Sequence, residues 1–165
     1  MAVSEAAQNR IERNVAAAAN LLFAPEVRRF EIPDLDRHGK WFLPRFLKEF
    51  PHLNERSAIG FLRGIIYSNE FLFLFQEKGV ALAQAMGSGG LEAEPIIWER
   101  FVWVEDPTNV EQQKAAAFFY NRIEKWAQTM GTKIVHVEMK SDVPHEMIKA
   151  QVGRVYETAQ KYLRC

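Results

Sequence analysis

Residues 96–140 decide the fold, and they read IIWERFVWVE (96–105), DPTNVEQQKAAAFFYNRIEKWAQTMG (106–131) and TKIVHVEMK (132–140). The first and third runs are rich in β-branched and aromatic residues and predict strands. The run between them has helix-forming composition with apolar residues at helical spacing. A strand, a helix and a second strand in one sheet make a βαβ unit, so we expect a parallel strand pair with a right-handed crossover.

The ends of these elements carry their own signals. Asp106 can cap the helix, Pro107 can open it and Gly131 can end it. The following strand, 133–140, alternates polar and apolar residues, which predicts that one of its faces is buried.

Outward from this unit, the chain predicts further elements without any internal repeat. We expect a mixed sheet flanked by helices, which is an α/β fold with an N-terminal helix ahead of it and little chain left for strands at its C-terminal end. The further elements are a helix over 4–23, a strand over 26–32 closed by a turn at Pro33 and Asp34, a helix over 41–50 opened by Pro44, a helix after Asn54, a hairpin of 71–76 and 79–86, and a last helix opened by Pro144 with a core face reaching Ala159.

No linker is long enough to separate two domains of this 165-residue chain. We therefore expect an N-terminal helical extension over 1–24 and one domain over 25–165. The extension has a candidate apolar stripe, which must bury against its own domain or against a partner. The stripe consists of Ile11, Val15, Ala18 and Leu22.

Composition excludes several classes of protein. Lysine plus arginine and aspartate plus glutamate both number 21, so the net charge is zero, which argues against nucleic-acid binding. The single cysteine, Cys165, permits no intrachain disulfide, and the four histidines form no ligand set, so no metal is expected. No run approaches the ~20 apolar residues of a membrane helix. A cytoplasmic protein is the expectation.

This order of elements resembles that of the GNAT-type N-acetyltransferases over about residues 26–160. The resemblance implies that acetyl-CoA binds where the two parallel strands separate. In that family the helix after the fourth strand begins with Gln-or-Arg-x-x-Gly-x-Gly-or-Ala, whose backbone N–H groups hold pyrophosphate. The stretch here reads QQKAAA, with alanine at both small positions. The cofactor-binding residues that the resemblance implies are Trp103, Val104, Glu105, Gln112, Gln113, Lys114, Ala115, Ala116 and Ala117.

Acetyl transfer needs a base for the amine and an acid for the leaving thiolate. Glu99 is the candidate base, because burial beside Trp98 would raise its pKa and because strand spacing predicts that it shares a face with Phe101 and Trp103. Tyr156 is the candidate acid by resemblance. A solvated glutamate and a tyrosine bordering the core remain the alternatives, and His136 is an alternative base.

Two function classes stay open. The first is an acyl-CoA-dependent N-acetyltransferase acting on a small-molecule or protein amine, with Trp41 and Trp103 as candidates for an acceptor groove or a protein contact. The second is a non-catalytic GNAT-like structural or interaction protein, such as a bacteriophage virion component. Because the C-terminal end leaves room for one short strand at most, we expect a homo-oligomer or docking to another protein.

Overall fold

The computed structural model describes residues 4–12, 26–87, 95–132, 135–137, 141–152 and 157–158. Its centre is a six-stranded sheet in the order β1-β2-β3-β4-β5-β6. The first four strands pair antiparallel, whereas β4–β5 and β5–β6 are parallel pairs. The strands are β1 (Arg28–Arg29), β2 (Phe71–Gln76), β3 (Gly79–Met86), β4 (Ile96–Val104), β5 (Val135–Val137) and β6 (Glu157–Thr158).

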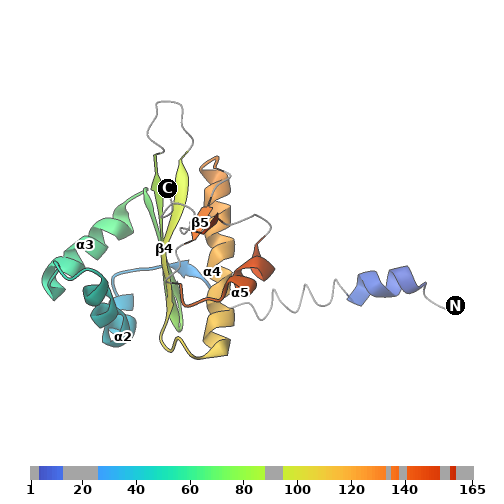
Figure 1. Ribbon diagram of the computed structural model, residues 1–165, viewed down its shortest axis with the longest axis horizontal. Coiled ribbons are helices and arrows are strands. Elements are labelled where there is room, and N and C mark those ends of the chain that lie inside the picture. The colour runs from blue at the N-terminus through green and yellow to red at the C-terminus, as the bar shows by residue number, and fades with distance from the viewer. Residues whose placement is uncertain are drawn as a thin grey trace.

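Helices cover both faces of this sheet (Figure 1). One face carries α2 (Asp34–Glu49) and α3 (Glu55–Tyr67), and the other carries α4 (Val110–Thr129) and α5 (His145–Gln151). The mixed α/β sheet, the hairpin of β2 and β3 and the parallel pair built by the βαβ unit are therefore confirmed. No helix in the described part of the chain is long and apolar enough to cross a membrane.

Local hydrogen bonds explain where the helices begin and end. Asn54 caps α3, with its side chain accepting from the Ser57 N–H while the Ser57 hydroxyl accepts from the Asn54 N–H. Helix α4 ends before Gly131, whose φ of 73° is the left-handed conformation that glycine adopts readily. Both signals were legible in the sequence.

Two predicted helix starts are wrong. Helix α2 begins at Asp34 rather than near Trp41, so Pro44 lies inside it. Helix α4 begins at Val110 rather than at Pro107, because the Asn109 side chain accepts from the Gln112 N–H and caps the helix. Asp106, the predicted cap, instead holds the preceding turn through the N–H and hydroxyl of Thr108.

The predicted last helix is too long. Helix α5 ends at Gln151, and Glu157–Thr158 form β6, although helical spacing had extended the helix to Ala159. Residues 5–12 are helical and fall within the predicted extension over 1–24. Ile11 of its apolar stripe is exposed, and the other stripe residues lie outside the described residues, so the domain division stays a prediction.

A β-bulge in β4 reverses one prediction. Glu99 pairs with Ala83 and Phe101 pairs with Leu82, so Arg100 is an extra residue. The extra residue shifts the alternation, and Glu99 faces α4 whereas Phe101 faces α2 and α3. The prediction that Glu99 shares a face with Phe101 and Trp103 is therefore wrong.

Candidate functional site

Strand β4 extends beyond its described pairing with β5. Among the described residues the two parallel strands pair at Ile97–Val135, Trp98–His136 and Glu99–Val137. Strand β4 continues to Val104 and pairs with β3 along its other side. The carboxyl ends of parallel strands are a common place for a ligand in α/β sheets.

Asp142, in the segment after β5, contacts the edge of β4 beyond Glu99. Its N–H donates to the Val102 carbonyl oxygen at 3.0 Å, and its Oδ2 accepts from the Val104 N–H at 2.9 Å. The guanidinium of Arg45, on α2, donates to both carboxylate oxygens of Asp142 at 2.6 and 2.8 Å. The same guanidinium lies 4.4 Å from the centre of the Trp103 ring. Asp142 therefore holds the backbone groups of Val102 and Val104 and is itself held by Arg45.

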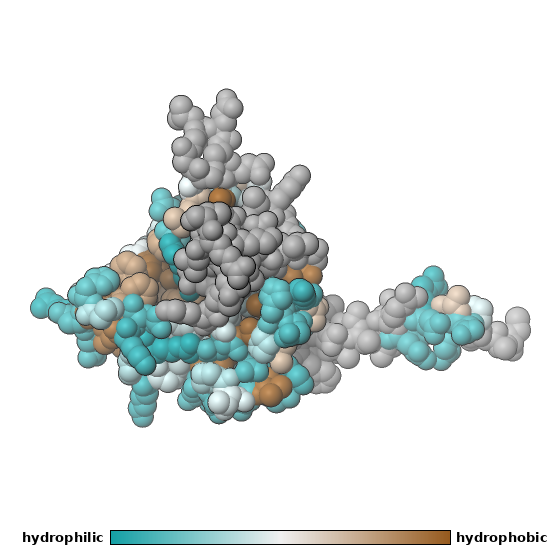
Figure 2. All heavy atoms as spheres, viewed as in Figure 1, coloured by the Kyte–Doolittle hydropathy of each residue, from teal (hydrophilic) through white to brown (hydrophobic). Residues whose placement is uncertain are grey.

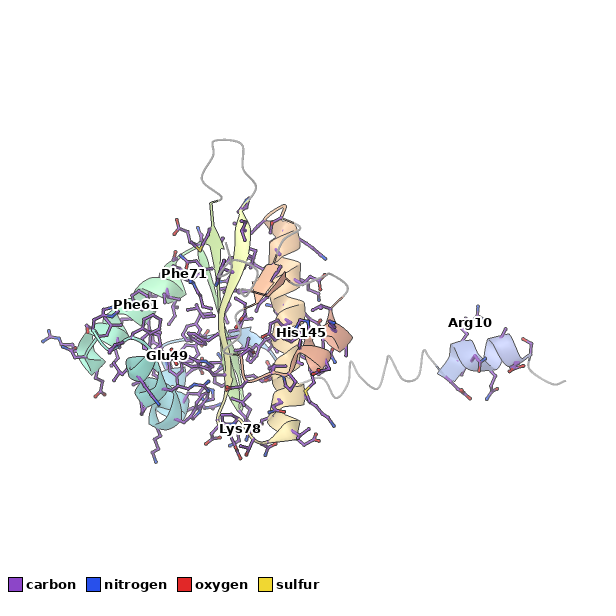
Figure 3. All side chains as sticks on the ribbon, viewed as in Figure 1. Arg10, Glu49, Phe61, Phe71, Lys78 and His145 are labelled. Carbon is purple, nitrogen blue, oxygen red and sulfur yellow. The ribbon has the colours of Figure 1, made fainter. Side chains whose placement is uncertain are left out.

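A pocket of about 520 Å³ adjoins this part of β4 on the α2–α3 side. We call it the aromatic pocket. Figure 3 shows Glu49, Phe61 and Phe71 on this side of the sheet, and Figure 2 shows hydrophobic side chains reaching the surface over α3. The lining residues are Glu49, Phe50, Phe61, Phe71, Leu82, Gln84, Arg100, Phe101 and Trp103.

The two charged residues of the aromatic pocket come from different elements. Arg100 sits at the bulge, and its Nε and Nη2 donate to the Gln84 Oε1 at 3.0 and 2.8 Å. Its guanidinium also lies 5.8 Å from the centre of the Trp98 ring. Glu49 is exposed at the end of α2. The pocket therefore combines an apolar wall with one cation and one carboxylate.

A second hollow of about 450 Å³ lies between α2 and the end of β4. Its lining includes the cations Arg45 and Lys48, the carboxylates Glu49 and Glu105, and Trp41 and Val104. The formal charge of this lining is zero, and Arg45 is already paired with Asp142, so Lys48 is the cation of this hollow best placed to meet an anionic group.

The structure separates the residues predicted to bind the cofactor. Trp103 lines the aromatic pocket, and Val104 and Glu105 line the hollow beside Arg45 and Lys48. Glu105 is paired with Lys78 at 3.0 Å, and the hydrogen bond that Lys78 donates to Glu105 raises the pKa of that lysine.

Residues 112–117 lie within the first turns of α4. Ala116 and Ala117 are buried against the sheet. Lys114 is exposed and 3.4 Å from Glu111. The predicted pyrophosphate signature therefore forms part of the helix–sheet contact at its alanine end.

Glu99, the predicted base, is not among the residues that line the aromatic pocket. Glu99 is fully buried on the α4 side of β4, with its Oε1 withdrawn from solvent. Tyr156 lies outside the described residues, and so does the side chain of His136.

Four residues of this region were not singled out from the sequence: Glu49, Arg100, Arg45 and Asp142. No local motif marks them. Arg45 and Asp142 are 97 residues apart, and Arg100 reaches its position through a bulge that the alternation of apolar residues does not reveal.

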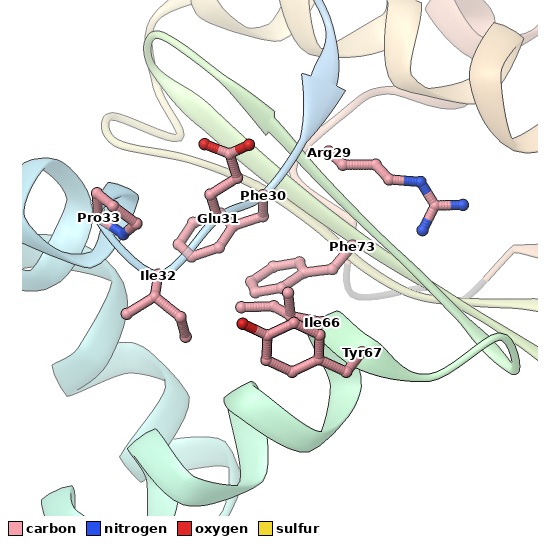
Figure 4. A pocket seen from close by; sticks show the side chains of 8 residues that line it. All are labelled: Arg29, Phe30, Glu31, Ile32, Pro33, Ile66, Tyr67 and Phe73. Carbon is pink, nitrogen blue, oxygen red and sulfur yellow. The ribbon is translucent and has the colours of Figure 1, made fainter.

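Other candidate sites carry less chemistry. Figure 4 shows a hollow of about 400 Å³ at the β1 edge of the sheet, where the Phe30 and Phe73 rings stack at 4.2 Å and Tyr67 forms part of the wall. This hollow is remote from β4 in the strand order. Within the described ranges, no cluster of three or more histidine, cysteine, aspartate or glutamate side chains could hold a metal.

Comparison with solved structures identifies the class of fold. The chain has the fold of the GNAT-type N-acetyltransferases. It is similar to the aminoglycoside antibiotic 6'-N-acetyltransferase AAC(6')-Ih from Acinetobacter baumannii, with a TM-score of 0.55, 15% identity, and coverage of 79% of this chain and 90% of that chain. No protein-family model matches the sequence, and no curated protein matches it significantly.

Two further structures support the same fold. A putative acetyltransferase from Agrobacterium tumefaciens has a TM-score of 0.55 and 10% identity, with coverage of 79% of this chain and 94% of that chain. AAC(6')-Iy, solved with the bisubstrate analogue CoA-S-monomethyl-acetylneamine, has a TM-score of 0.51 and 14% identity, covering 76% of this chain and 84% of that chain. At these identities the likeness establishes the fold.

Proposed function

We propose that this chain is an acyl-CoA-dependent N-acyltransferase that uses acetyl-CoA and transfers the acetyl group directly to an amine. One observation carries the proposal. The carboxyl-terminal part of β4 adjoins the aromatic pocket on the α2–α3 side, in a sheet that has the fold of the acetyltransferases. The aromatic pocket is the proposed acceptor site.

The edge of β4 and the neighbouring hollow offer groups that the cofactor could use. Asp142 shows the bonding capacity of the edge, since it gives one N–H to Val102 and receives one from Val104. The amides of the pantetheine arm offer the same combination of donor and acceptor and would take the place of Asp142. Lys48, in the neighbouring hollow, is placed to meet phosphate charge. We therefore assign the arm to the edge of β4 and the phosphates to this hollow.

Bound acetyl-CoA supplies an activated thioester carbonyl. The chain's own residues would orient the amine and keep water from it, with Phe101 and Trp103 covering the inner wall. Glu49 is the carboxylate within the lining of the aromatic pocket and is our candidate to take the amine's proton. Roles for Glu99 and Tyr156 as base and acid stay predictions.

A thermal melt with acetyl-CoA tests the proposal. Ligand at a hundred times its dissociation constant should stabilise the chain by about 2.7 kcal/mol. Lys48→Gln should weaken this effect because it removes a cation from the hollow. Lys40→Gln is the matched control, since Lys40 is exposed on the same helix but does not line that hollow. Equal shifts in both variants would contradict the phosphate assignment.

A specific observation also supports the second function, a non-catalytic protein with this fold. Asp142 occupies the edge of β4, and Arg45 holds it there. A protein that has lost the cofactor has no need of an open edge. The variant Asp142→Ala separates the two functions, because it frees the Val104 N–H. If acetyl-CoA shifts the melt of neither wild type nor Asp142→Ala, the non-catalytic function is supported.

A further inference from the structure

The wall of the aromatic pocket indicates which amine it suits. Its lining residues are predominantly rings, which come from α3, β2 and β4 and from Phe50 directly after α2. Phe101 and Trp103 stack on each other at 4.0 Å with an interplanar angle of 15°. Phe50 and Phe61 lie 6.3 Å apart at 42°. Rings in such arrangements accept a further ring by stacking or by edge contact.

The opening of this pocket is aromatic as well. Phe61 is 43% exposed, although phenylalanine is usually buried in a folded chain. It lies on α3, where its ring is 6.2 Å from that of Phe46 and leaves one face toward the pocket and solvent. An apolar ligand body placed against Phe61 would remove this surface from water.

The charges of the pocket argue against a polycation. The lining contains one carboxylate, on Glu49, and one guanidinium, on Arg100, so its formal charge is zero. A ligand with several ammonium groups would lose hydration beside the rings and meet an arginine. A ligand with a single ammonium group, placed opposite the Glu49 carboxylate, suits this lining.

We propose that the acceptor is a primary amine carried on an aromatic body, either an arylalkylamine or an aromatic amino acid. This inference rests on the proposed function. The ring of the acceptor lies among Phe61, Phe71 and Phe101, and where the acceptor has a carboxylate, Arg100 meets it. In the transfer, the amine nitrogen bonds to the acyl carbon and the carbon–sulfur bond breaks. The sulfur leaves as a thiolate, which takes up one proton as the amine gives up one.

The first test is binding of phenethylamine to the full chain, followed by calorimetry. We expect phenethylamine to bind at least tenfold more tightly than spermidine or kanamycin. Phe61→Leu, which removes the ring but keeps an apolar cover, should weaken phenethylamine at least fivefold. Tyr67→Ala is the matched control, because Tyr67 is an 81% exposed aromatic residue of the same helix that belongs to the other hollow.

The second test distinguishes the two sources of the aromatic amine. Arg100→Gln should weaken phenylalanine severalfold and leave phenethylamine unchanged if the acceptor carries a carboxylate. If wild type acetylates phenethylamine and phenylalanine equally well, the arylalkylamine is the acceptor. Preference for spermidine or kanamycin, or equal binding of phenethylamine by wild type and Phe61→Leu, overturns the inference.

The outcomes separate this inference from the function on which it rests. A melt shift with acetyl-CoA and no binding of phenethylamine retains the transferase and overturns the aromatic acceptor. Binding of phenethylamine that is lost in Phe61→Leu, with no shift from acetyl-CoA, supports the aromatic ligand site and contradicts the transferase.

Discussion

The two sides of the sheet are packed with different side chains, and the difference decides where a ligand can enter. On the α4 side the contact combines five alanines with larger side chains such as Phe119 and Tyr120; the alanines are Ala81 and Ala83 on β3 and Ala116, Ala117 and Ala127 on α4. The α2–α3 side is filled by rings, among them Phe30, Phe42, Phe46, Phe73, Phe101 and Trp103.

Small side chains let a helix approach a sheet closely, and close approach leaves little space between the layers. Rings are large and planar, and they tile a surface with gaps between them. The hollows of about 400, 450 and 520 Å³ all adjoin the α2–α3 side. The comparison teaches that the alanine-rich side supports the fold, whereas the aromatic side supplies the candidate site.

Phe42→Ala should have the largest effect on stability. The ring is fully buried and lies within about 6 Å of the Phe30, Phe73 and Trp103 rings, so its loss removes the centre of the aromatic side. We expect a loss of about 3–5 kcal/mol in the free energy of unfolding, measured by urea denaturation. Phe61→Ala is the control and should cost far less, because that ring is partly exposed. Similar losses would contradict the contrast between core rings and pocket rings.

Asp142→Asn tests the contact that Asp142 makes with Arg45 on α2 and with the backbone of β4. It removes the charge that pairs with Arg45 and weakens the acceptor for the Val104 N–H. Hydrogen bonds to charged groups contribute about 1.5–3 kcal/mol, and we expect a loss in this range by urea denaturation. Glu105→Gln, which alters the exposed pair with Lys78, should cost far less, because solvent screens that pair.

Ala117→Leu probes the tightness of the α4 side. Ala117 is 1% exposed against the sheet, so the added atoms must displace neighbours, and we expect a loss of about 1–3 kcal/mol. Leu82→Phe is the counterpart on the other side, where the larger residue can extend into the aromatic pocket. A thermal melt should show the smaller loss for Leu82→Phe, and the reverse order would refute the packing contrast.

His38 gives the aromatic side a pH dependence. The Trp41 indole N–H donates to Nδ1 at 2.9 Å, so Nδ1 is unprotonated and Nε2 donates to the Gln76 carbonyl oxygen at 3.0 Å. Burial lowers the pKa of His38 below its ordinary 6.5. The unfolded chain therefore takes up this proton at a higher pH than the folded chain does.

The titration of His38 should therefore not change the free energy of unfolding above about pH 6.5. Below that pH the free energy of unfolding should fall, by at most about 1.4 kcal/mol per pH unit. Urea denaturation between pH 7.5 and 5 measures this slope, and His38→Gln should flatten it. Asp34 does not act in this window. Burial raises the pKa of Asp34, but hydrogen bonds from Arg28 and the Glu31 N–H bring it below its ordinary 3.8. An unchanged slope in His38→Gln would exclude His38 as the cause.

Predictions from the sequence succeeded where short-range chemistry decides the structure. The Asn54 cap, the hairpin of β2 and β3 and the end of α4 at Gly131 depend on neighbours within a few residues. The parallel pairing of β4 and β5 followed from the helix between them. Helix starts were less predictable. Asp106 and Asn109 are both residue types that cap helices, and the sequence does not show that Asp106 accepts from Thr108 whereas Asn109 accepts from Gln112 in α4.

The sequence by itself determined the element order, the mixed sheet and hence the fold class, because hydrophobic period, caps and turn residues act locally and the βαβ crossover has one hand. Only the tertiary structure decided the face of Glu99, since one extra residue at Arg100 inverts the alternation of β4. It also decided that Asp142 meets Arg45 across 97 residues and that rings from separate elements enclose the aromatic pocket. Contacts between distant residues depend on how the layers pack, and the spacing of residues along the chain does not predict that packing.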